Sequence, residues 1–114
     1  MNVVRFEQCE QYEPAGHAGV VNRLLVGRES GGIEDVSVWH GTIETGGFAE
    51  PHVHEGASQV YVAMTGTITV VGESVTSDLQ PGDAVVFSPG ERHEVRNRSA
   101  KEATLLVIST PALR

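Results

Sequence analysis

Residues 46–66 read GGFAEPHVHEGASQVYVAMTG, and the His52-Val53-His54 segment at their centre is the most informative part of the chain. Residues two apart in a β-strand point to the same face, so His52 and His54 can converge on one point while Val53 faces away. Pro51 fits the start of such a strand, where its missing N–H is tolerated. Two imidazoles on one strand face can clamp a divalent transition metal, but most histidine pairs of this kind are solvated or hydrogen-bonded. The pair alone leaves both interpretations open.

Short segments rich in β-branched residues recur on both sides of this stretch. Turn-forming residues separate them, and amphipathic helical periodicity is hard to find. Runs of about four to eight residues with such regular punctuation predict an all-β sandwich or barrel. The predicted strands are Val20–Val26, Val36–Ile43, Gln59–Met64, Thr67–Val71, Ala84–Phe87, His93–Val95 and Thr104–Ile108.

The remaining segments predict loops and one edge strand. Gly31-Gly32 and Gly46-Gly47 indicate loops, and Leu79–Asp83 indicates a turn that leads into a strand. Val3–Phe6 is expected to form an edge strand. Exposed edge strands are commonly covered or paired with another chain, so we expect a homodimer.

The composition is that of a single globular domain. The 114 residues carry 8 Lys and Arg against 15 Asp and Glu, a formal net charge of −7, which argues against binding of nucleic acid or anionic membranes through bulk charge. One cysteine, Cys9, excludes an intramolecular disulfide and a cysteine-rich metal cluster, and it fits a reducing compartment. No apolar run reaches the length of a signal peptide or a membrane span. We therefore expect a cytoplasmic protein with no nucleic-acid or membrane partner.

The residues around the histidine pair follow a regular spacing. Gly46 lies six residues before His52, Gln59 lies five after His54, and Gly66 lies seven after Gln59. This spacing makes the pair a more specific signal than it is by itself.

A second spaced group lies downstream. Gly90 lies eight residues after Gly82, His93 lies three after Gly90, and Asn97 lies four after His93. Ser88 stands two residues before Gly90. The two groups together resemble the two motifs of the cupin superfamily, with Gln59 in the place of a glutamate and Ser88 in the place of a proline.

The resemblance covers about residues 36–110 and implies a single-domain cupin β-barrel, or jelly roll, with a metal inside. It places the conserved barrel with both motifs at residues 36–114. Residues 1–35 would then supply N-terminal strands and connecting loops that pack on the barrel.

The resemblance also implies a ligand set for one divalent transition metal ion, which could be Fe, Mn, Ni, Zn or Cu. The implied ligands are His52, His54, Gln59 and His93. An amide is neutral, so the ion keeps its full charge and attracts anionic oxygen ligands strongly. The alternative is a three-histidine site that Gln59 does not join.

Two residues are candidates for catalysis. Tyr61 shares a strand face with Gln59, so if Gln59 points inward the Tyr61 phenol can reach a bound ligand. His40 can act as an acid or base near the metal if Val38, His40 and Thr42 face inward. The alternative for His40 is a surface or hydrogen-bonded histidine.

Other polar residues near the motifs have ordinary explanations. His17 is expected to be a solvated loop residue, and Trp39 a core or interface residue. Glu50 and Glu55 flank the histidine pair and can either hydrogen-bond a ligating imidazole or remain solvated. Asn97 can support the metal site, can stabilise a turn, or can be solvated.

The ligand set leaves room for a small anionic or carbonyl-containing molecule on the metal, which points to an enzyme acting on a sugar acid or keto compound. The site is similar to that of the single-domain cupins of pectin and alginate breakdown, which convert 4,5-unsaturated uronates. Those cupins carry an aspartate on the last strand, whereas the matching segment here, Leu106–Ser109, has no carboxylate. The alternatives are an Fe- or Cu-dependent dioxygenase and a non-catalytic binding or sensor protein.

Overall fold

A computed structural model describes residues 1–114, and the regular secondary structure of the chain is almost entirely β, as predicted. The helical part is one 3₁₀ turn, η1 (Phe6–Gln8). The strands are β1 (Gln11–Tyr12), β2 (His17–Val26), β3 (Ser37–His52), β4 (Ser58–Thr65), β5 (Ile68–Val71), β6 (Thr76–Leu79), β7 (Ala84–Phe87), β8 (His93–Arg96) and β9 (Ala103–Thr110). No helix has the length and apolar character that crossing a membrane requires.

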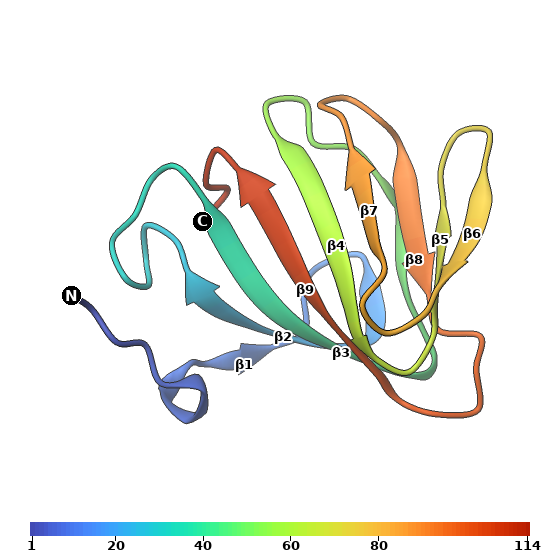
Figure 1. Cartoon of the computed structure of the whole chain (residues 1–114), viewed down its shortest axis with the longest axis horizontal. Helices are drawn as coiled ribbons and strands as arrows, with labels where there is room; N and C mark the ends of the chain where they lie inside the picture. The colour runs from blue at the N-terminus through green and yellow to red at the C-terminus, as the bar shows by residue number, and fades with distance from the viewer.

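The long strand β3 joins the two parts of the sheet (Figure 1). Its first half, from Ser37 to Ile43, pairs with β9, and its second half pairs with β8 through Phe48 and Ala49. β2 pairs along the other edge of both halves. Gly46 lies between the halves with φ +81°, a conformation that glycine adopts readily. The strand order is β6-β5-β8-β3-β9-β4-β7, and the strongly bent sheet forms a near-closed barrel.

The interior is filled by alternate side chains from facing strands. Ile43 of β3, Tyr61 of β4, Ile68 of β5, Val95 of β8 and Leu105 of β9 are all buried members of one apolar cluster. Burial of each such aliphatic side chain stabilises the fold by about 1.5–3 kcal/mol. Alternation also means that the strand phase decides which side chains reach the interior.

Two local predictions are wrong, and strand β6 was missed. Gly46-Gly47 lie within β3 rather than in a loop. Val3–Phe6 does not form an edge strand, because the chain enters η1 at Phe6. β6 was not expected, since three of its four residues are exposed and its sequence, TSDL, is largely polar. The homodimer, which rested on the edge strand, stays a prediction.

Asn97 is a buried residue that connects β3 to the turn between β8 and β9. It is 1% exposed, and its Nδ2 donates to the carbonyl oxygens of Ile43 at 2.9 Å and Lys101 at 2.7 Å. Its Oδ1 accepts from the backbone N–H and the hydroxyl of Ser99. Asn97 is therefore a turn residue and is not solvated.

Replacing Asn97 with Ala should lower the free energy of unfolding by about 2–4 kcal/mol, because buried carbonyl groups lose their donor. Urea denaturation followed by Trp39 fluorescence measures this change. Arg98→Ala, at an exposed neighbouring position, serves as the control and should change stability by less than about 0.5 kcal/mol. Equal stabilities of the two variants would contradict the structural role of Asn97.

Candidate metal centre

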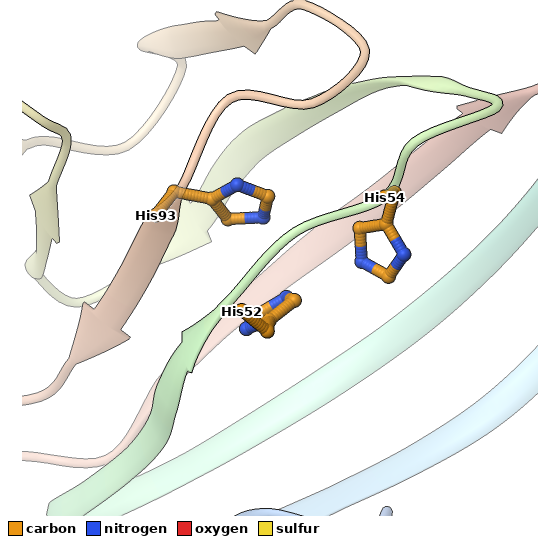
Figure 2. Close-up of side chains that lie close together, drawn as sticks. All are labelled: His52, His54 and His93. Atoms are coloured by element: carbon orange, nitrogen blue, oxygen red, sulfur yellow. The ribbon is translucent and has the colours of Figure 1, made fainter.

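Three histidines converge at one end of the barrel (Figure 2). His52 ends β3, His54 lies just beyond it, and His93 begins β8 directly opposite His52 in the strand register. One nitrogen atom from each ring lies within 4.8 Å of one from each of the others. The structure thus brings together the three histidines of the predicted ligand set, although β3 ends before His54.

Backbone carbonyl groups orient two of these rings. Nδ1 of His52 lies 2.8 Å from the carbonyl oxygen of Glu50, and Nδ1 of His93 lies 2.9 Å from that of Glu91. A carbonyl oxygen only accepts, so Nδ1 carries the proton in each ring. Nε2 of each neutral imidazole therefore keeps its lone pair, which is the form that binds metal.

Packing fixes the plane of the His93 ring. The ring of Phe87, at the end of β7, stacks on it with centroids 4.0 Å apart and planes 9° apart. Tyr61 approaches the same imidazole edge-on, with centroids 5.8 Å apart. His93 itself is only 2% exposed. This imidazole is therefore held in place by aromatic neighbours as well as by its hydrogen bond.

Gln59 lies beside His93 in an arrangement that suits a cation. Its Nε2 donates to the hydroxyl of Ser109 at 3.0 Å, which turns its Oε1 toward Nε2 of His93 at 3.1 Å. With Nδ1 of His93 protonated, both of these facing atoms are acceptors. Two ligands at right angles on a metal, each about 2.1 Å away, are separated by about 3 Å. The donor set therefore fits a metal ion; protonation of His93 would also relieve the contact, but burial lowers the pKa of that ring.

Burial also keeps the His54 imidazole neutral. Desolvation lowers the pKa of this ring most, the neighbouring His52 and His93 rings add to the effect, and together they bring it to about 4. A metal-binding imidazole must be unprotonated, so low pKa values keep this site ready for metal at neutral pH.

A cavity of about 430 Å³ adjoins the histidines. Tyr61 lines it and is 3% exposed, and burial raises the pKa of its phenol, which keeps the proton on the oxygen. Trp39 and Tyr12 line it as well, and the indole Nε1 donates to the Tyr12 hydroxyl at 2.7 Å. The cavity thus has an apolar wall with hydroxyl groups beside a cluster of imidazoles.

The structure does not bring His40 to this cavity. Trp39 and Ile43 line the cavity, so His40, on the other phase of β3, faces the opposite side of the sheet. There its ring contacts that of Phe6 edge-on, with centroids 5.0 Å apart. A catalytic role for His40 required Val38 and His40 to face the interior of the barrel. They face the other side of the sheet.

Two further residues line the cavity, one expected to be solvated and one whose role the sequence left open. His17 is half-buried rather than solvated, its ring centroid lies 6.1 Å from that of His52, and its Nδ1 lies 2.8 Å from the carbonyl oxygen of Ala15. Glu50 lines the cavity, whereas Glu55 does not. His17 reaches the site because β2 pairs with the distal half of β3, and nothing in the local sequence signals that contact.

The metal-free protein should lose stability as the pH falls from about 6.5 to 4. The pKa of His54 is lowered in the fold, so the unfolded chain takes up the proton first and the free energy of unfolding decreases over this window. Thermal unfolding across this pH range, with a chelator present, measures the effect. His54→Asn should show a shallower pH dependence, and an unchanged slope in this variant would contradict the assignment.

Comparison with known proteins agrees with the fold. The family model described as the cupin domain matches residues 39–109. A β-D-galactosidase of Mycobacterium tuberculosis is 32% identical over 107 residues, which cover 94% of this chain and 91% of that protein. The structure of KdgF from Halomonas sp. matches with 17% identity and a TM-score of 0.83, covering 96% of this chain and 94% of that one. The polyketide cyclase RemF from Streptomyces resistomycificus matches with 19% identity and a TM-score of 0.82, covering 96% and 79%. The chain belongs to the cupin family.

Proposed function

We propose that this cupin is a metal-dependent enzyme that acts on a small, oxygen-rich substrate, such as a sugar acid or a keto sugar. One observation carries the proposal: three imidazole nitrogens lie within 4.8 Å of one another beside a cavity of about 430 Å³. Cavities of this size accommodate small molecules. A substrate in the cavity would therefore have its oxygen atoms next to the metal ligands.

The ligands of the ion would be His52, His54 and His93, each through one ring nitrogen, and Gln59 through its amide oxygen. The hydrogen bonds of the His52 and His93 rings to backbone carbonyl groups support this set, because they leave Nε2 free. The bond from Gln59 to Ser109 supports it as well, because it turns Oε1 toward the histidines. Fe, Mn, Ni, Zn and Cu all suit this ligand set.

A bound divalent ion would supply Lewis acidity, which polarises the carbonyl and hydroxyl groups of a substrate. The other contribution comes from the chain itself. Tyr61 lines the cavity, and its raised pKa keeps the phenol protonated, so it would donate a hydrogen bond to a substrate oxygen. Burial of the cavity walls strengthens such hydrogen bonds by excluding water.

The choice of a carbohydrate has support from the sequence relative. That relative, 32% identical over nearly the whole chain, is by name a β-D-galactosidase. Trp39, Tyr12 and Tyr61 give the cavity aromatic surface with hydroxyl groups, and such surface suits the apolar C–H faces and hydroxyl groups of a sugar. Val107, which also lines the cavity, stands where the uronate-converting cupins carry a carboxylate, and Ser109 two residues further on holds Gln59 in place.

Substitution of His52 or His93 with Ala should lower metal affinity by at least about 100-fold, since each removes one imidazole from the set. After loading with Co²⁺ and dialysis, elemental analysis gives the metal content and circular dichroism shows that the barrel is folded. His40→Ala, on the opposite face of β3, is the matched control and should keep its metal. Full occupancy in both the His52 and His93 variants would refute the ligand assignment.

Gln59→Glu should slow the loss of Co²⁺ to a chelator by about tenfold or more, because a carboxylate adds a negative charge to the ligand set. Gln80→Glu, at an exposed position, makes the same change in net charge away from the histidines and should have no effect. Equal rates of metal loss in the Gln59 variant and the parent would leave a three-histidine site.

A further inference from the structure

The cavity lining includes a carboxylate but no Lys or Arg side chain. Among its nineteen lining residues there is no Lys or Arg, and Glu50 is the only acidic one. Glu50 is exposed and lies at the cavity rim, two residues before His52, with its backbone N–H bonded to the carbonyl oxygen of Gly16. A negatively charged ligand group away from the histidines would therefore meet a carboxylate and no side-chain cation.

Two arginines that adjoin cavity-lining residues in the chain, Arg114 and Arg23, are engaged elsewhere. The guanidinium of Arg114 stacks over the ring of Tyr12 at 4.8 Å and pairs with Glu29 at 3.2 Å, and it lines a separate groove. Arg23 stacks over Phe6 and donates to backbone carbonyl groups on the opposite side of the sheet, where it lines the same hollow as His40. Neither guanidinium lines the cavity next to the histidines.

The rest of the wall is largely apolar. Ten of the nineteen lining residues are hydrophobic, and Val20, Ile43 and Leu105 among them are buried in the core. Moving a phosphate or a second carboxylate from water to such a wall without a counter-charge carries a large free-energy cost. A hydroxyl group is far less costly to place there, because the Tyr61 phenol, the Asn22 amide and the Glu50 carboxylate can hydrogen-bond it.

We propose that the part of the ligand that extends from the histidines into the cavity is neutral and hydroxylated, as in an unphosphorylated sugar, and that Glu50 excludes phosphorylated forms. This inference rests on the proposed function, because it concerns the ligand of the same site. It leaves one place for a negative group, at the metal itself. It thereby narrows the substrate class to neutral sugars and to compounds whose single anionic group lies at the metal.

The test compares two sugars of the same ring that differ in charge. Calorimetric titration of the Co²⁺-loaded protein with D-galactose and with D-galactose 6-phosphate should show at least about tenfold tighter binding of the neutral sugar. Glu50→Gln should reduce this preference to within about threefold, and Glu50→Lys should reverse it. Glu55→Gln, which removes a carboxylate on the other side of the histidine pair and outside the cavity lining, is the matched control and should keep the preference.

The Co²⁺ absorption spectrum of every variant separates this inference from the proposed function. If the spectrum is unchanged and the phosphorylated sugar binds as tightly as D-galactose, the inference is overturned. The same holds if neither sugar binds at millimolar concentration, or if Glu50→Gln leaves the preference intact. If the parent protein fails to bind Co²⁺, the proposed metal-dependent function itself fails.

Discussion

The antiparallel pairing of β3 with β8, which sets His52 opposite His93, is the constraint on which the site depends. The same strand is bonded to β9 over its first half and to β2 along its other edge. The position of His52 relative to His93 is therefore determined by four strands rather than by one loop. A slip of β8 by one residue against β3 would turn His93 to the face of the sheet opposite His52.

The sequence was sufficient for the features that depend on local spacing. β-branched runs indicated most strands, and the spacing around His52, His54 and His93 indicated residues that the fold does bring together. Local spacing did not show which face of the strand over residues 36–43 points inward. Val38 on one face and Trp39 and Ile43 on the other are all apolar. His40 consequently stayed a candidate until the strand register placed it on the opposite face.

Contacts between distant segments account for what was missed. His17 reaches the cavity through its pairing opposite Ala49, and Asn97 is buried because it bonds Ile43 across the sheet. Gly46 was expected in a loop because glycine pairs usually mark one, yet here its positive φ lets β3 bend without ending. Each of these features depends on which strands become neighbours, and a single sequence does not carry that information locally.

The stacking of Phe87 on His93 has a consequence for energetics. Because this imidazole is already confined by an aromatic neighbour and by a backbone carbonyl, the conformational entropy of ordering it is lost when the chain folds and not when an ion arrives. His54, which follows the end of β3 and makes no such stack, keeps more of its rotamer freedom. If a metal ion were held by these residues, its binding would then cost less conformational entropy at His93 than at His54.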